Sequence, residues 1–111
     1  MKPQQITAMR EAADAACALL KTLGNRERLL LLCQMIDGEK SVSELEELLD
    51  IHQPTLSQQL GVLRSEGLVE TRRDGKRIYY SLASSEAVAL LNTLYGIFCP
   101  ATLTSRKKAA G

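Results

Sequence analysis

The sequence predicts a mainly α-helical domain that carries one small β-hairpin. Its 111 residues match the size of a single domain. Hydrophobic residues make up 45% of the chain and aromatic residues only 4%, so the core must consist largely of Leu and Ala, which favour helices. Apolar residues also recur at three- and four-residue spacing along most of the chain, and a single strong hairpin signal, Asp74-Gly75, interrupts this pattern.

Two helices are expected in the first third of the chain. The first is amphipathic over residues 5–22 and ends at Gly24, because its apolar residues follow helical spacing: Ile6, Met9, Ala13, Ala16, Leu20 and Leu23. Asn25 is a favourable N-cap for the second helix. The apolar face of that helix covers residues 29–36 and is followed by the turn signal Asp37-Gly38.

A helix-turn-helix pair is expected next. Ser43 and Glu46 match a capping box, which predicts a short helix over residues 43–49 with three inward-facing leucines, Leu45, Leu48 and Leu49. Pro54 suits the first position of a fourth helix, where its missing N–H is not needed. That helix is expected to stop at Gly67 and to bury Leu56, Leu60 and Leu63.

Strand-like runs over residues 68–73 and 76–82 flank Asp74-Gly75, a dipeptide whose two residues are both expected to adopt positive φ. Ser84 or Ser85 then caps a final helix that has an apolar face formed by Val88, Leu91, Leu94 and Tyr95. The order of elements is helix, helix, helix, helix, strand, strand, helix. This order is that of a winged helix-turn-helix.

Charge is segregated along the chain, although the formal net charge is only +1. Residues 37–50 hold six acidic side chains and one lysine, whereas residues 72–77 hold four basic side chains and one aspartate. Near neutrality argues against a uniformly cationic DNA-coating protein. Residues 101–111 are basic and lack apolar periodicity, so they are predicted to be a disordered tail after a domain over residues 1–100.

The fourth helix and the hairpin together indicate binding to double-stranded DNA. Short hydroxyl and amide side chains near the start of such a helix can contact base edges and phosphates in the major groove, and basic residues on a wing can contact phosphates. The alternative is a polar helix face beside an ordinary charged turn. The expected DNA-binding residues are Gln53, Thr55, Ser57, Gln58, Gln59, Arg64, Arg72, Arg73, Lys76 and Arg77.

Five segments together resemble the ArsR family of bacterial repressors over about residues 12–100: residues 23–29, 57–60, 63–64, 66–69 and 79–82. The resemblance implies a homodimer built on the first and last helices, with the helix over residues 54–66 reading operator DNA. The chain departs from the family pattern at Gln59, where many members have His, and at His52, where Ser is frequent.

The metal sites for which this family is known lack their ligands here. Residues 44–50 contain no cysteine, and residues 84–98 contain a single carboxylate, Glu86. The only histidine, His52, lies in the helix-turn-helix turn, where a polar turn residue is expected. We therefore predict no metal and no cofactor.

Cys33 and Cys99, in their sequence contexts, are similar to the pair found in the persulfide- and redox-sensing branch of the same family. That resemblance implies that reactive sulfur species or other thiol oxidants bridge the pair by a disulfide or polysulfide and release the DNA. Two alternatives stay open, namely a constitutive regulator with structural cysteines and a metal-responsive regulator. Cys17 extends the apolar face of the first helix and is expected to fill a core or a dimer interface.

Other functional classes find little support. Three cysteines in 111 residues are too few for a disulfide-stapled secreted miniprotein. No phosphate-binding glycine loop, paired-carboxylate motif or cofactor fingerprint is present, so an enzyme is not expected. The longest apolar run, residues 29–33, is too short to span a bilayer, and the N-terminal residues do not form a signal peptide. A cytoplasmic protein without a membrane partner, associated with the nucleoid when bound to DNA, is therefore expected.

Overall fold

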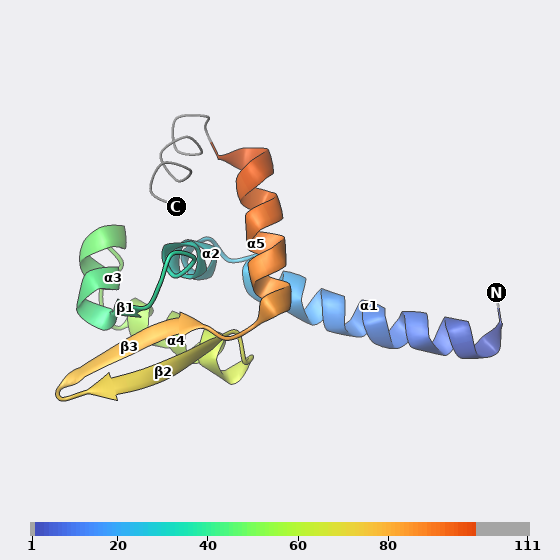
Figure 1. Ribbon diagram of the computed structural model, residues 1–111, viewed down its shortest axis with the longest axis horizontal. Coiled ribbons are helices and arrows are strands. Elements are labelled where there is room, and N and C mark those ends of the chain that lie inside the picture. The colour runs from blue at the N-terminus through green and yellow to red at the C-terminus, as the bar shows by residue number, and fades with distance from the viewer. Residues whose placement is uncertain (1, 100–111) are drawn as a thin grey trace.

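Five helices and three short strands form the part of the chain that the computed structural model describes, residues 2–99 (Figure 1). The predicted tail over residues 101–111 lies outside the described residues. The predicted winged helix-turn-helix is confirmed, with a third strand added. In chain order the elements are α1 (Pro3–Leu23), α2 (Arg26–Gln34), β1 (Lys40–Ser41), α3 (Val42–Leu49), α4 (Thr55–Ser65), β2 (Val69–Asp74), β3 (Arg77–Leu82) and α5 (Ser85–Phe98).

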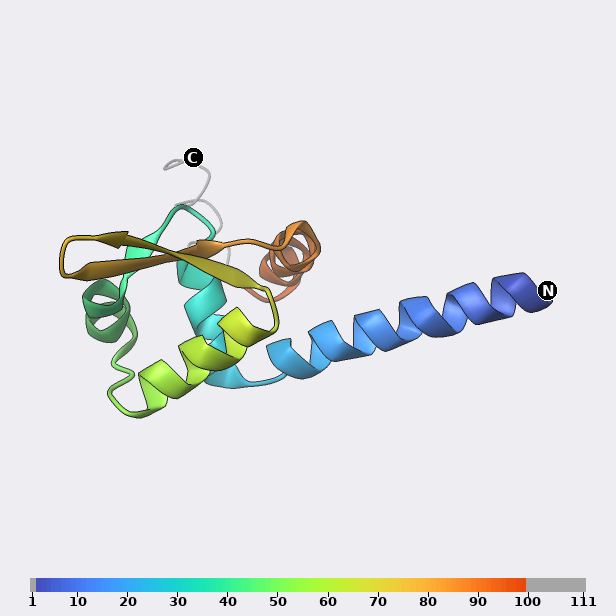
Figure 2. The ribbon, with the colours of Figure 1, turned by 90° about the horizontal axis from the view of Figure 1, so that it is seen from below.

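Helix α1 projects away from the rest of the protomer in both ribbon views (Figures 1 and 2). It ends at Gly24, as predicted, and the N–H of Gly24 donates to the carbonyl of Leu20 at 2.8 Å. The apolar face of α1 is largely uncovered, since the side chains of Met9 and Leu20 are 56% and 55% exposed. Cys17 is exposed as well, so the expectation of a core role for it is wrong within one protomer.

The start of α3 differs from the prediction. Ser41, not Ser43, is the N-cap: its hydroxyl accepts from the N–H of Glu44, and the Glu44 carboxylate accepts from the N–H of Ser41. The helix therefore begins one residue earlier, at Val42. Leu48 is 57% exposed, so its predicted inward orientation is wrong, whereas Leu45 is fully buried.

The sheet has three antiparallel strands in the order β1-β3-β2, rather than the predicted two. Lys40 and Ser41 pair with Tyr80 and Tyr79 of β3. At the hairpin, Asp74 stays in β2 opposite Arg77, so the two-residue loop is Gly75-Lys76. Only the glycine has a positive φ, 64°, and the expected positive φ at Asp74 is wrong because that residue remains extended.

The start of α4 also differs from the prediction by one residue. Pro54 is the N-cap and Thr55 is the first helical residue. At the other end, Glu66 is the C-cap and Gly67 follows with a φ of 74°. Helix α5 begins after Ser84, whose hydroxyl accepts from the N–H of Ala87 at 3.1 Å.

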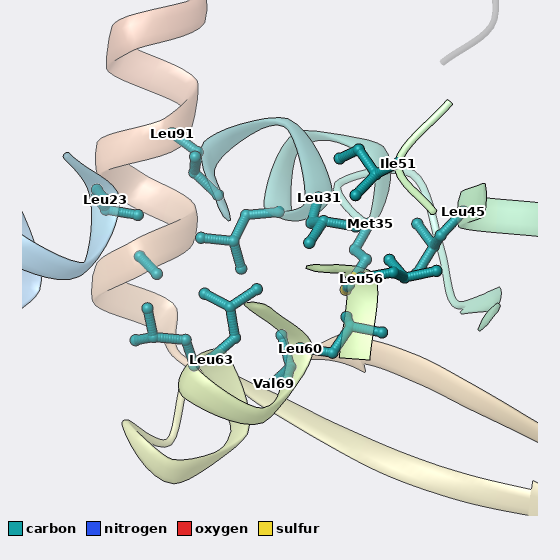
Figure 3. Close-up of a cluster of buried hydrophobic side chains, with 13 residues drawn as sticks. Leu23, Leu31, Met35, Leu45, Ile51, Leu56, Leu60, Leu63, Val69 and Leu91 are labelled. Atoms are coloured by element: carbon teal, nitrogen blue, oxygen red, sulfur yellow. The ribbon is translucent and has the colours of Figure 1, made fainter. Parts of the chain in front are cut away.

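The core lies between α2, α3, α4, α5 and the sheet (Figure 3). Its fully buried side chains are aliphatic, as the scarcity of aromatic residues predicts. Helical spacing in α4 aims three leucines inward and leaves the rest of that helix free to face solvent. The largest fully buried residues are Leu31, Leu32, Leu45, Leu56, Leu60, Leu63 and Leu91. Within residues 2–99, no helix combines the length and apolar character that crossing a membrane requires.

Candidate nucleic-acid interface and thiol pair

Burial of its leucines orients α4 so that its polar residues form the outer surface. Thr55, Ser57 and Gln58 are exposed, and Gln59 is half-buried at the edge of that surface. Gln53 precedes the helix, and its side-chain oxygen accepts from the N–H of Ser57 at 3.1 Å. This contact satisfies one of the unpaired N–H groups of the first turn. The structure therefore places four of the predicted polar residues along one exposed helix start, with Gln53 holding the turn that leads into it.

The turn between α3 and α4 is closed by polar contacts. Asp50 ends α3 in a left-handed conformation, with φ 55°. The Nε2 atom of His52 lies 2.6 Å from Oδ1 of Asp50, and its Nδ1 atom lies 4.0 Å from a carboxylate oxygen of Glu46. The histidine thus acts as the polar turn residue that its position predicts. Across residues 2–99, no three His, Cys, Asp or Glu side chains gather so as to hold a metal ion.

The hairpin carries the four predicted cations, but one of them is already engaged. Arg72 donates two hydrogen bonds to the carboxylate of Glu39, and its guanidinium carbon lies 4.7 Å from the centre of the Tyr79 ring. These hydrogen bonds hold the pKa of Glu39 below its ordinary value of 4.5 and raise the pKa of Arg72. Arg73 and Lys76 are exposed and make no ion pair within residues 2–99.

The hairpin tip and the start of α4 lie toward the end of the protomer opposite the N-terminus of α1 (Figure 2). Arg77 is exposed near this tip, at the start of β3. Arg64 is exposed in the last turn of α4, farther along the same helix. A hydrogen-bonding helix start and a cluster of exposed cations thus occupy one end of the domain, an arrangement suited to base edges and phosphates respectively.

The two cysteines singled out by the sequence lie on different helices. Cys33 is near the end of α2, half-buried and packed against the hydrophobic core. Cys99 is the C-cap of α5, where its N–H donates to the carbonyl of Tyr95 at 3.0 Å. None of the three cysteines in the described part of the chain is in a disulfide. Cys33 lies on α2, a helix that packs against α4, which carries the exposed polar residues.

Comparison with known proteins decides the family. The family model "Bacterial regulatory protein, arsR family" matches residues 25–71. A biofilm growth-associated repressor of Agrobacterium fabrum is 54% identical over 94 residues, covering 85% of this chain and 80% of that protein. The chain belongs to the ArsR family. It is a DNA-binding transcriptional regulator rather than an enzyme, and dimers are typical of this family.

Solved ArsR-family structures share the whole fold. The transcriptional repressor BigR from Xylella fastidiosa has a TM-score of 0.79 and 50% sequence identity, and the match covers 90% of this chain and 99% of BigR. Reduced HlyU from Vibrio cholerae has a TM-score of 0.81 and 39% identity, with 84% of this chain and 98% of HlyU covered. The apolar face of α1 is uncovered in the protomer, which is consistent with the dimers that are typical of the ArsR family.

Two residues that contact the predicted site were not found from the sequence. Glu39 is one of six acidic residues in the stretch over residues 37–50, and nothing in the sequence distinguishes it from the others. Its carboxylate accepts hydrogen bonds from Arg72 of the hairpin. Arg28 lies in α2 and donates to the side chain of Gln59 on α4. Both contacts join residues more than 30 positions apart, so no local sequence pattern signals them.

Proposed function

We propose that this ArsR-family protein is a homodimeric repressor that leaves its operator when Cys33 and Cys99 become bridged. The observation that carries the proposal is the placement of two half-buried thiols at the ends of two helices, Cys33 on α2 and Cys99 on α5. Of these helices, α2 packs against α4. The inducer is a reactive sulfur species or another thiol oxidant, and the protein acts in the cytoplasm, on the nucleoid when bound. The DNA contacts come from α4 and the hairpin: Gln53, Thr55, Ser57, Gln58, Gln59, Arg64, Arg72, Arg73, Lys76 and Arg77.

An organic polysulfide, RS–(S)n–SR, supplies both the sulfur and the oxidising equivalents for such a bridge. The Cys33 thiolate attacks the sulfur next to one terminal RS group, forming an S–S bond and expelling RS⁻. The Cys99 thiolate then attacks the sulfur next to the remaining RS group and expels it in the same way. Two cysteine thiols are oxidised, the polysulfide is reduced to two RSH molecules, and the two cysteine protons end on those molecules.

Bridging acts on DNA binding through packing. A link between Cys33 and Cys99 ties the end of α2 to the end of α5, and α2 in turn packs against α4. In a dimer, the two α4 helices must fit major grooves about 34–36 Å apart. A bridge that favours another spacing by about 1–3 kcal/mol lowers operator affinity by roughly 5–150-fold. By linkage, bound operator opposes bridging to the same extent.

The test uses Cys33→Ser and Cys99→Ser, with Cys17→Ser as a matched control that removes an exposed cysteine outside the proposed pair. We expect all three reduced variants to bind operator DNA like the parent in a mobility-shift titration. Organic trisulfide should release DNA from the parent and from Cys17→Ser, but not from the other two variants. Mass spectrometry should find one added sulfur atom linking Cys33 to Cys99.

Two other outcomes would each favour one of the alternatives, a constitutive regulator or a metal-responsive one. If Cys33→Ser or Cys99→Ser fails to bind DNA when reduced, the cysteine has a structural role. If the reduced parent is released by a divalent metal ion and not by trisulfide, the protein is metal-responsive. Either result removes the thiol switch while leaving the DNA-binding function in place.

A further inference from the structure

One guanidinium, that of Arg28 in α2, contacts both the end of α1 and the side of α4. Its Nε atom donates to the carbonyl of Thr22 at 2.6 Å and its Nη2 atom donates to the carbonyl of Lys21 at 3.3 Å. Both carbonyls belong to the last turn of α1, where helical N–H donors run out; the Lys21 carbonyl also accepts from the N–H of Gly24 at 3.3 Å. The Nη1 atom donates to Oε1 of Gln59 at 3.1 Å. The backbone N–H of Arg28 is held by the Asn25 cap, so the base of this side chain is fixed too.

The contact with Arg28 determines which end of the Gln59 amide faces α2. A guanidinium has five N–H donors and no acceptor, so only the amide oxygen of Gln59 can face it. The amide nitrogen must then point elsewhere with its two N–H donors. Within residues 2–99, no protein acceptor receives a hydrogen bond from that nitrogen. Because Gln59 is half-buried, its neighbours also limit the orientations that its side chain can adopt.

We propose that Arg28 is a positioning residue that makes Gln59 a donor-only contact for DNA. The proposal rests on the proposed function, because it assumes that α4 enters the major groove. A free glutamine can both donate and accept, and can therefore pair with any base edge. A glutamine whose oxygen is turned toward Arg28 presents only its amide N–H donors to the DNA, so it selects an acceptor: N7 or O6 of guanine, N7 of adenine, or O4 of thymine. Cytosine offers only a donor at its major-groove edge and is excluded.

A double-mutant cycle tests this inference. The full-length parent is first used to select duplexes from a random-sequence DNA library, and every base pair of the selected duplex is then substituted in turn. Gln59→Met keeps the length of the side chain but removes the amide, and Arg28→Lys keeps the charge but removes the planar set of donors. Arg26→Lys, the same change at an exposed position two residues earlier, is the control.

We expect Gln59→Met to lose the preference at one base pair of each half-site, by about 2- to 12-fold, the effect of one hydrogen bond. Arg28→Lys should lose the same preference at the same base pair, and the double variant should lose no more than either single variant. Arg26→Lys should keep the parental profile. The slope of affinity against salt should stay parental in all variants, because no phosphate contact changes.

Four results overturn the inference. Arg28→Lys could weaken binding to all duplexes equally and also lower the melting temperature of the protein. Arg28 would then have a purely structural role. The two single effects could add in the double variant, which would mean that the residues act independently. If the parent enriches a sequence but Gln59→Met keeps its full base profile, the inference fails and the proposed function stands. If the parent enriches no sequence, the proposed function fails as well.

Discussion

The guanidinium of Arg72 on β2 is bound to the carboxylate of Glu39 in the loop before β1, with Nε 3.2 Å from Oε2 and a second bond from Nη2 to Oε1. The pairing is bidentate, and Tyr79 of β3 covers the guanidinium face. The contact joins the middle of the hairpin to the segment that leads into the helix-turn-helix. It therefore fixes the direction of the wing and partly neutralises one of its four cations.

Replacing Glu39 with Gln should increase the affinity of the protein for DNA at low salt. The substitution removes a negative charge beside the hairpin and releases Arg72 to bind phosphate. We expect the slope of log affinity against log salt to steepen by about 0.9 for each additional phosphate that the protein neutralises. A mobility-shift titration at several salt concentrations measures this slope. An unchanged slope with weaker binding would mean that the orientation of the wing matters more than the released charge.

Removing two hairpin cations should have the opposite effect. The double variant Arg73→Ala, Arg77→Ala is expected to bind more weakly and to show a flatter salt dependence, by about 0.9 in slope for each phosphate that is no longer neutralised. Lys40→Ala is the matched control, because Lys40 is cationic but already paired with Asp37 at 3.2 Å. Equal slopes for the parent and the double variant would remove the wing from the DNA interface.

The order of the helices was predictable because their aliphatic residues keep helical spacing, but the start of α3 was not. Two overlapping capping boxes are present, Ser41 with Glu44 and Ser43 with Glu46, and both satisfy the sequence pattern. Pairing across the sheet decides between them. Ser41 is held opposite Tyr79 in β1, so its hydroxyl is in place to cap the helix that follows. A two-residue strand is too short to be recognised from sequence alone.

The candidate site was predictable to a similar degree. Polar residues of α4 could be assigned to the outer surface, because the buried leucines occupy the opposite side. The partners of individual side chains could not be assigned. Gln59 and Arg72 were both expected to face DNA, yet Gln59 accepts a hydrogen bond from Arg28 and Arg72 donates to Glu39 within the protein. Such contacts depend on the distance between elements far apart in sequence, which local patterns do not encode.

A charge on the exposed face of α1 should dissociate the dimer without unfolding the protomer. Leu20→Glu places a carboxylate at a position that is 55% exposed in the protomer and that we expect the partner subunit to cover. Burying it there without a counter-ion should raise the dimer dissociation constant by more than about 100-fold. Leu48→Glu, at a position 57% exposed on α3, is the control and should stay dimeric. Sedimentation gives the mass and circular dichroism the helix content; a dimeric Leu20→Glu variant would place the interface elsewhere.

The capping box of α3 predicts a loss of stability in acid. The N–H of Ser41, followed by its hydroxyl, holds the pKa of Glu44 below the ordinary value of 4.5. A carboxyl whose pKa is lower in the folded state stabilises the fold fully above the unfolded-state pKa. That contribution disappears as the pH falls from about 4.5 through the lowered pKa. Glu44→Gln keeps an acceptor for the cap but cannot titrate, so its urea midpoint should depend less on pH below 5 than that of the parent. Parallel curves for the two proteins would show that Glu44 does not contribute.

Inducers that add sulfur should release DNA more efficiently than hydrogen peroxide does. Peroxide joins two thiols only by a direct disulfide, which requires Cα atoms within about 7 Å of each other, whereas each inserted sulfur lengthens the bridge. A longer bridge between Cys33 and Cys99, on α2 and at the end of α5, should require less movement of the two helices. We therefore expect more DNA release by organic trisulfide than by peroxide at the same fraction of thiols consumed. Both reactions are run on Cys17→Ser, so that the exposed third thiol does not contribute. Equal release at equal thiol consumption would mean that a direct disulfide forms without strain and that the length of the bridge has no part in induction.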